Sequence, residues 1–273
     1  MIASRALSCL LAFLPAPTLS APVDVQTVII LDFTNRSVTG GENLARLATD
    51  GVAVELAASG KFEVLRRAEV ERTAKELNLS PPYDAMAQSK LASELGASAI
   101  VDGSIDYVNE RIKNGIRTIV VALKVHVRET SSGELINGAA VIGESSGPLS
   151  EDRTANTYKA GAITVELVVR RILAHKLVEG VVISTHGLLP KGVDALLNVG
   201  EKQGVRTGME MMVLRDGKKV GTVKVVGVWP TDSELKITQV GSGIRPEDRV
   251  REVFDEPHYQ TRDELIDPNK RKK

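Results

Sequence analysis

The stretch SELGASAIVDGSI, residues 93 to 105, joins the end of a predicted helix to a predicted strand, and the rest of the fold is built around it. Gly96 follows the last apolar residue of the helical pattern, and glycine is the common residue just past a helix end. The residues after it are apolar and β-branched, which predicts a strand with Gly103 inside it. A glycine in a strand lets another segment approach the backbone, so we interpret this stretch as architecture without a reactive group.

The residues before this stretch predict strands that alternate with helices. VQTVIILDF, residues 25–33, is a continuous apolar run rich in β-branched residues, as in a strand covered on both faces. A helical pattern follows and ends at Gly60, and FEVL at 62–65 predicts a short strand. Two further helical patterns end at Pro81 and at Gly96. The alternation favours an α/β arrangement.

Three strands in succession are predicted next, followed by one long helix. Residues 99–108 alternate, so that one face is expected to carry Val101, Gly103, Ile105 and Tyr107. Asn114-Gly115 is a hairpin signal, because both residue types accept a positive φ. Strand patterns at 116–129 and 135–145 complete a mixed sheet, and an apolar helix face at 152–177 is expected to cover it.

The pattern changes after Gly180. Short strand patterns separated by glycine turns, among them the hairpin signal Asp216-Gly217, predict a small all-β barrel. We therefore expect an α+β/α/β chain with a domain of mixed sheet and packed helices at 22–178 and a small barrel at 179–254. Residues 255–273 are charged and hold few apolar residues, which predicts a disordered tail.

The N-terminus predicts a cleavable secretory signal over residues 1–21. Arg5 precedes an apolar run that is too short to span a bilayer, and small residues follow up to Ala21. A buried N-terminal helix is the alternative. Cys9 is the single cysteine and lies inside the apolar run, whereas a lipid-modified cysteine would follow it, so lipid attachment is not expected. The mature chain would hold no disulfide, which fits a bacterial periplasm.

The charge balance excludes one broad class of partner. The chain has 35 Lys plus Arg and 35 Asp plus Glu, and 3% of its residues are aromatic. A surface without net charge does not attract nucleic acid or an anionic membrane, and few aromatic side chains are available to stack on bases. We therefore expect no nucleic-acid partner.

One motif matches the pattern of a catalytic nucleophile. GESSG at 143–147 fits G-x-S-x-G and lies between a predicted strand and a predicted helix, with Ser145 as the candidate. Pro148 follows directly and does not suit the tight turn that exposes such a serine. We interpret the motif as a strand end with a Ser-Gly-Pro turn, and an enzyme that uses Ser145 is the alternative.

No other group of residues predicts chemistry. The histidines do not pair with another ligand at metal-site spacing, and they are His126, His175, His186 and His258. TGGEN at 39–43 precedes a helix and could offer amides to a phosphate, but it lacks the lysine of nucleotide sites, so we interpret it as a cap. Asp102 and Asp106 flank Ser104 on a polar strand face, where they share a site or face solvent or a partner. We predict no catalytic, cofactor-binding or metal site, and no cofactor.

The first domain resembles the CsgG-type envelope proteins, whose fold also forms the N-terminal domain of TolB. The resemblance rests on DFTNRS, on GGENLARLATDGVAVELAASGKFEVLRRAEVERTAKELNLS and on ASELGASAIVDGSI. The family pattern runs from an aromatic-x-Val strand through an arginine and an acidic helix end to Leu-Gly-Ala and Gly-Ser. Its positions are Phe62, Val64, Arg67, Glu76, Leu95, Gly96, Ala97, Gly103 and Ser104.

The second domain resembles the small C-terminal barrel of the flagellar protein FlgT, which also has a TolB-like domain before it. A Gly-Val-x-x-Gly pattern is matched at Gly204, Val205 and Gly208, and a Pro-Gly-Asp-x-Val pattern at Pro246, Glu247, Asp248 and Val250. Glu247 stands where the pattern has glycine, so that turn is expected to differ. CsgG itself is lipidated and forms a pore from long membrane hairpins, whereas the hairpin at 113–115 is tight, which disfavours a pore.

These resemblances imply a non-enzymatic scaffold or assembly protein of the bacterial envelope that acts in the periplasm by protein–protein contact. The expected partners are envelope proteins, with those of the flagellar basal body first. A CsgG-like component of an outer-membrane secretion or transport apparatus is the alternative. Peripheral contact with the outer membrane and an oligomer within a ring stay open.

Overall fold

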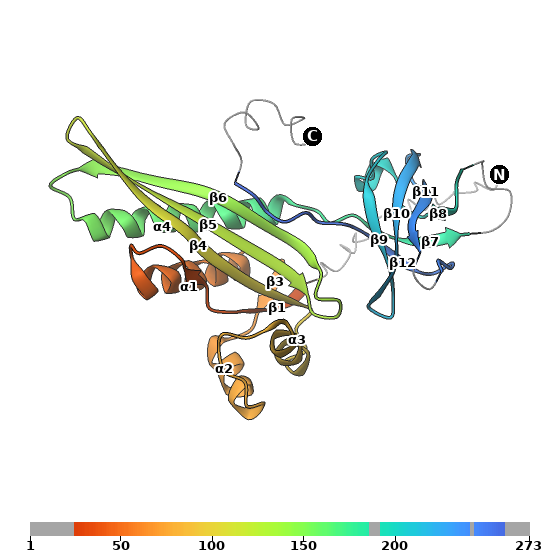
Figure 1. The fold of residues 1–273 in the computed structure, drawn as a ribbon, viewed down its shortest axis with the longest axis horizontal. Helices are drawn as coiled ribbons and strands as arrows, with labels where there is room; N and C mark the ends of the chain where they lie inside the picture. Colours follow the sequence, from red (N-terminus) through yellow and green to blue (C-terminus); the bar gives the residue numbers. More distant parts are fainter. Residues whose placement is uncertain (1–24, 186–191, 241–242, 260–273) are drawn as a thin grey trace, which may run out of the picture.

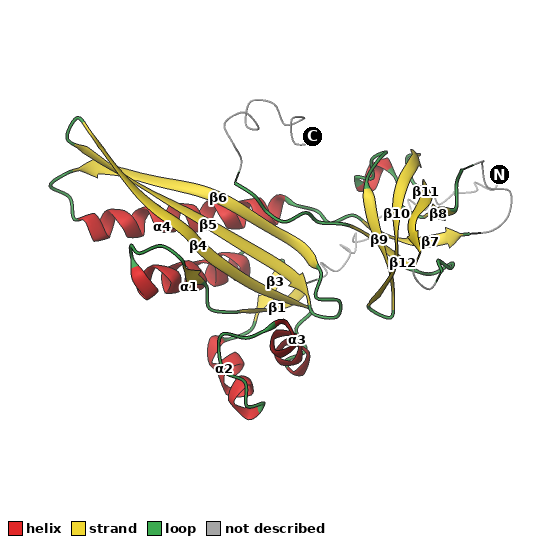
Figure 2. Ribbon diagram, in the orientation of Figure 1, coloured by secondary structure: helices red, strands yellow, loops and turns green. Residues whose placement is uncertain are grey.

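The computed structural model describes residues 25–185, 192–240 and 243–259, which form a mixed sheet covered by helices and a closed barrel (Figures 1 and 2). The predicted signal at 1–21 with Cys9 lies outside the described residues, as does His186. The boundaries predicted for the two domains stay predictions. The prediction of a mixed sheet with packed helices followed by a barrel is confirmed.

Six strands of the described residues form the mixed sheet, and their bounds are β1 (Gln26–Ile30), β2 (Thr34–Asn35), β3 (Phe62–Val64), β4 (Ala99–Lys113), β5 (Ile116–Glu129) and β6 (Leu135–Pro148). The order is β3-β1-β4-β5-β6, with β2 beside β4. Strand β1 runs parallel to both of its neighbours, whereas β4, β5 and β6 form an antiparallel ladder. Strand β6 is therefore an edge of the sheet.

The helices of the described residues cover both faces of the sheet, and they are α1 (Gly41–Ala58), α2 (Arg67–Glu76), α3 (Ala85–Glu94) and α4 (Arg153–Ala174). Val28 of β1 packs in a core with residues of α1 and α4, whereas Ile29 packs in a second core with residues of α2 and α3. The prediction that this strand is covered on both faces is confirmed. None of these helices combines the length and the apolar character that crossing a membrane requires.

The two glycines of the opening stretch act as the sequence predicts. Gly96 has φ of 65° and closes α3, where the N–H of Ala97 donates to the carbonyl of Ala92 at 2.9 Å. A Cβ atom at Gly103 would lie 2.9 Å from the ring of Phe33, so only glycine admits this ring against the strand. Both positions serve the packing of helix and loop on β4.

A β-bulge changes the face on which Tyr107 lies. The register of β4 and β5 shifts between Ile105 and Tyr107, so that Tyr107 pairs with Ala122. An extra residue in one strand turns the following side chains to the opposite face. Ile105 stays in the core, whereas Tyr107 faces the other side of the sheet and packs against Tyr259. The prediction that Tyr107 shares the face of Ile105 is wrong.

The barrel closes from six strands of the described residues, β7 (Glu179–Ser184), β8 (Ala195–Leu197), β9 (Glu210–Arg215), β10 (Lys218–Val228), β11 (Ser233–Val240) and β12 (Arg249–Glu252). Their order is β10-β11-β8-β7-β12-β9. The turn before β10 has positive φ at Asp216 and Gly217, which confirms the hairpin signal. Glu247 has φ of 73°, so the chain keeps a left-handed backbone where the resemblance has glycine.

The chain leaves the barrel after β12 and runs back along the sheet in an extended segment, residues 254–259, which we call the C-terminal strap (blue in Figure 1). A Cβ atom at Gly138 would lie 2.8 Å from Cγ of Pro257, so the strap lies directly on β6. The structure differs here from the predicted disordered tail, because Pro257 and Tyr259 pack on the sheet and Glu256 binds His126. The remainder of that tail, 260–273, lies outside the described residues.

Candidate functional site

A polar cluster lies under the strap, on the face of β4 and β5 that points away from α1 and α4. Asp102 and His126 reach this face because they alternate with core residues along their strands. Nδ1 of His126 lies 2.9 Å from Oδ1 of Asp102, and Nε2 lies 2.7 Å from Oε1 of Glu256 in the strap. Both nitrogens of the imidazole ring are therefore bound by carboxylates, one from the sheet and one from the strap.

A second contact fixes the end of the strap. The hydroxyl of Tyr259 donates to Oδ2 of Asp106 at 2.8 Å, and Oγ of Ser104 donates to Oδ1 at 2.7 Å. The rings of Tyr259 and Tyr107 lie 6.0 Å apart between centroids. The structure thus brings together the predicted group of Asp102, Ser104 and Asp106, and it turns this group toward the strap.

The pKa values in the cluster follow from these contacts. Burial lowers the pKa of His126, but the hydrogen bonds and charges of Asp102 and Glu256 outweigh burial and raise it above the usual value. Burial raises the pKa of Tyr259, and its hydrogen bond to Asp106 raises it further. The cluster therefore favours a protonated imidazole and a neutral phenol.

The arrangement can hold the strap, and it lacks the pairing that nucleophilic catalysis needs. The hydroxyl of Ser104 donates to Asp106, whereas His126 is bound to Asp102 and Glu256. A serine nucleophile requires its hydroxyl at hydrogen-bond distance from the base. Within the described ranges, no group of three His, Cys, Asp or Glu residues is arranged to hold a metal ion.

Ser145 lies inside a regular strand. It pairs with Ile119 of β5, and the ladder continues to Pro148, so the backbone makes no sharp turn at the serine. His126 pairs with Gly138, which is seven positions from Ser145 along β6. At roughly 3.4 Å per residue, the two sites are about 24 Å apart. The structure does not assemble a nucleophile elbow at this motif.

The other predicted residues lie apart from this cluster. His175 follows α4, and its ring centroid lies 4.8 Å from that of Phe254, where burial lowers the pKa of the imidazole. His258 lies in the strap and lines a cavity of about 460 Å³ together with His175. Gly40 has φ of 81° and caps α1, which begins at residue 41 as the cap interpretation of TGGEN requires. Arg67 lines the cavity beside the start of α1, and its guanidinium is bound to Asp32 and Asp50.

The contact between sheet and barrel depends on residues that the sequence did not single out. Oε2 of Glu129, at the end of β5, lies 2.7 Å from Nη1 of Arg251, and Oε1 lies 3.2 Å from Nη1 of Arg249. Ser132 donates to the same carboxylate at 2.7 Å. Burial raises the pKa of Glu129, but Ser132 and the two arginines outweigh burial and lower it. No local signal marked this contact, because Arg251 alternates with the barrel-core residue Val250 and so takes an outward position of its strand, where an arginine is common.

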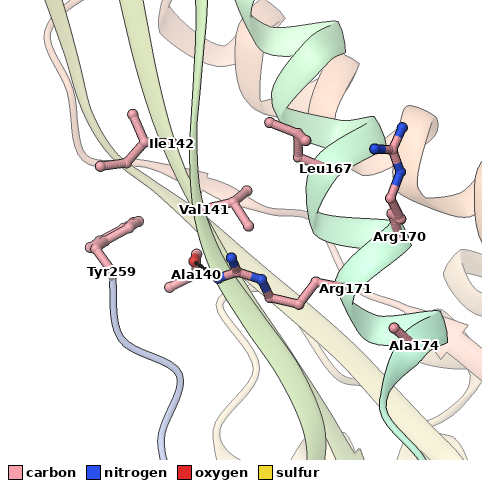
Figure 3. Close-up of a pocket in the computed structure, with 8 residues that line it drawn as sticks. All are labelled: Ala140, Val141, Ile142, Leu167, Arg170, Arg171, Ala174 and Tyr259. Atoms are coloured by element: carbon pink, nitrogen blue, oxygen red, sulfur yellow. Dashed lines mark hydrogen bonds between the residues drawn. The ribbon is translucent and has the colours of Figure 1, made fainter. Parts of the chain in front are cut away.

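The free edge of β6 borders a groove, which we call the edge groove and which has a volume of about 480 Å³ (Figure 3). Its lining residues come from β6, α4 and the strap, and they are Ala140, Val141, Ile142, Leu167, Arg170, Arg171, Ala174 and Tyr259. Figure 3 shows Leu167 of α4 and Tyr259 of the strap on opposite sides of β6. Nη1 of Arg171 donates to the carbonyl of Ala140 at 3.0 Å, which closes one end of the edge.

Comparison with known proteins gives structural likeness only. No protein-family model and no curated protein matches the chain. The C-terminal domain of LpoB from Salmonella enterica superposes with a TM-score of 0.35 at 18% identity, over 44% of this chain and 84% of that one. Lipoprotein GNA1162 from Neisseria meningitidis gives 0.40 at 16% identity, over 55% and 99%. PelC from Paraburkholderia phytofirmans, a dodecamer, gives 0.37 at 14% identity, over 57% and 94%.

These values describe a distant structural likeness and carry no conclusion about function. The three structures are not CsgG, TolB or FlgT, so the resemblance to those proteins stays a prediction.

Proposed function

We propose that the protein is a non-enzymatic scaffold of the bacterial cell envelope that acts by protein–protein contact after export to the periplasm. The observation that carries this proposal is the open edge of β6 on a body whose two parts are joined by buried contacts. An unpaired strand edge is a ready template for another chain. The polar residues His126 and Asp106 bind the strap.

A scaffold must hold its partners at fixed positions relative to each other. Two connections between the sheet and the barrel support this role. Glu129 binds Arg249 and Arg251 of the barrel, and the strap returns from the barrel to bind His126 and Asp106 of the sheet. A single covalent linker would leave the parts free to move relative to each other. The additional contacts favour one body with a long sheet at one end and a barrel at the other (Figure 2).

The assembly that we propose first is the flagellar basal body, because the order of a TolB-like domain and a small barrel matches the sequence resemblance to FlgT. A secretion or transport apparatus of the outer membrane is the alternative. The partner proteins recovered from cells distinguish the two.

The test is chemical cross-linking in the native cells, followed by purification of the full chain and identification of the proteins attached to it. We expect envelope proteins in stoichiometric yield, with ring proteins of the basal body among them. Outer-membrane secretion components would replace the flagellar assignment with the alternative. Recovery of the protein alone, or from the cytoplasm, would overturn the scaffold proposal.

A further inference from the structure

Among the residues of β6 whose backbone groups point away from the sheet, three in a row along the free edge lack a described hydrogen-bond partner. In an antiparallel ladder, alternate residues bond to the neighbouring strand and the residues between them face outward. Leu149 donates its N–H to Gly115 of the neighbouring turn, and the carbonyl of Ala140 accepts from Arg171, which fixes the phase of this alternation. The outward positions left are Ile142, Glu144 and Ser146, and their N–H and C=O groups have no partner among the described residues.

The side chains next to these positions are apolar on the side of α4. Ile163 is 40% exposed, and Leu167 lies one turn further along the same helix face. Gly143 and Thr164 touch so closely that α4 lies directly on β6, and the apolar row therefore runs beside the free edge. Ile142 is 43% exposed at the mouth of the edge groove. An additional strand would cover these three side chains while its backbone pairs with β6.

Charge distinguishes the two ends of the edge. Arg170 and Arg171 lie at the end nearer Ala140, and Glu166 is the acidic residue bound to Arg170 there. Glu166 binds Nη2 of Arg170, and the other N–H groups of this guanidinium can bind a second carboxylate. Glu144 lies at the other end, where Nη2 of Arg111 is 3.7 Å from its carboxylate.

A second copy of the same chain does not suit this edge. Two β6 strands related by a twofold axis run antiparallel. All three free residues of each copy form backbone hydrogen bonds only in the register that places Glu144 of one copy opposite Glu144 of the other. Like charges directly opposite each other destabilise a strand pair. The edge therefore favours a partner of different sequence.

We propose that β6 binds an extended segment of another envelope protein as an added strand, with apolar side chains over Ile163 and Leu167 and an acidic residue next to Arg170. This proposal rests on the proposed function, because it names the surface through which the scaffold holds a partner. Main-chain hydrogen bonds to Ile142, Glu144 and Ser146 would supply the attachment, and the apolar row and Arg170 would supply the selectivity.

The test places the photo-reactive amino acid p-benzoylphenylalanine at position 142 of the full chain in native cells and maps the adduct in the partner. A second change at position 144 isolates the backbone donor. Glu144→Pro removes one outward N–H without breaking the ladder, because this N–H does not bond to β5. Glu144→Ala removes the same side chain and keeps the donor. The photo-reactive residue at Val54, exposed on α1, measures the background.

We expect an adduct with a segment of alternating apolar residues and an acidic residue in another protein. Glu144→Pro should lower its yield about tenfold or more, and Glu144→Ala should change it less than about twofold. An adduct between two copies of this chain, a yield equal to that at Val54, or a yield that Glu144→Pro leaves unchanged would overturn the proposal. Thermal unfolding of the purified variants confirms that both are folded.

Failure of this inference is distinguishable from failure of the proposed function. If chemical cross-linking recovers the same envelope partner from the wild type and from Glu144→Pro, the scaffold stands and the edge is not its binding surface. If neither chain yields a partner, the scaffold function itself fails.

Discussion

Glu129 and Arg251 form the ion pair that joins the sheet to the barrel, with Oε2 of Glu129 2.7 Å from Nη1 of Arg251. The side chain of Arg251 is completely buried, and its Nη2 donates to Sδ of Met212 at 3.4 Å. A buried guanidinium needs a carboxylate because water cannot reach it. The pair therefore makes the barrel depend on the end of strand β5.

Removing the carboxylate should destabilise the protein strongly. Glu129→Gln leaves Arg251 buried without an opposite charge, and the free energy of unfolding should fall by about 3 kcal/mol. The measurement is denaturation by urea, followed by circular dichroism. Glu179→Gln is the matched control, since it removes a carboxylate that binds the more exposed Arg249, and it should cost less than about 1 kcal/mol. Equal losses in both variants would contradict this account of the contact.

The attachment of the strap should weaken as pH rises through the neutral range. The pKa of His126 is raised in the folded protein, so its protonated form stabilises the fold fully below about pH 6.5, the unfolded value. That contribution is lost as pH rises through the folded pKa. Asp102 and Glu256 bind the ring of His126, and Arg128 and Lys124 in turn form ion pairs with these two carboxylates.

The measurement for His126 is the difference in unfolding free energy between the wild type and His126→Gln at a series of pH values. This difference should be greatest at mildly acidic pH and should shrink toward alkaline pH. Faster hydrogen exchange in residues 254–259 of the wild type at alkaline pH would locate the change in the strap. If the difference in unfolding free energy is constant or grows with pH, the ion pairs of the His126 ring are not what stabilises the wild type.

Asn156 of α4 should be replaceable with a gain in stability. Its side chain is completely buried, and neither Oδ1 nor Nδ2 has a hydrogen-bond partner within the described part of the chain. Asn156→Leu has a similar volume and should raise the free energy of unfolding by about 1 kcal/mol. Asn137→Leu should lower it, because Nδ2 of Asn137 donates to the carbonyl of Ile172 and Oδ1 accepts from Gly138. Thermal unfolding measures both, and destabilisation by Asn156→Leu would indicate that this amide has a partner.

Replacing Glu247 should also raise the free energy of unfolding, because the backbone of this residue is left-handed. A residue with a Cβ atom costs about 1 kcal/mol in this region, whereas glycine adopts it freely. Glu247→Gly should therefore stabilise the barrel, by somewhat less than that amount since glycine also loosens the unfolded chain. Glu247→Ala keeps a Cβ atom and should give no gain. A gain in the alanine variant as large as that in the glycine variant would place the effect in the side chain.

The turn at Asn114-Gly115 and the strand β1 could be predicted, because each is determined by residues that are adjacent in the sequence. Asn114 and Gly115 have φ of 51° and 77°, as the hairpin signal requires. The β-branched run of β1 reads as a strand covered on both faces for the same reason. Tyr107 could not be placed, since the bulge beside it is a property of how β4 pairs with β5 and leaves no mark in the alternation of β4 alone.

The contacts that matter for the proposed function join residues far apart in the sequence. Glu256 binds His126 over a separation of 130 residues, and Tyr259 binds Asp106 over 153. No local pattern encodes such a pair, and the charged composition of the strap pointed to disorder. The exposure of β6 as an edge depends on strand order, which becomes visible only when the sheet is assembled.

The apparent mass of the protein in gently solubilised envelopes of the native cells tests the central claim most directly. If the protein acts by contact with a partner at the edge of β6, the wild type and Glu144→Ala should migrate in a complex well above the mass of the single chain, which is 29.3 kDa before removal of the predicted signal. Glu144→Pro should shift toward the mass of the single chain. Migration of the wild type as a single chain would contradict the claim that contact with another envelope protein is what this protein does.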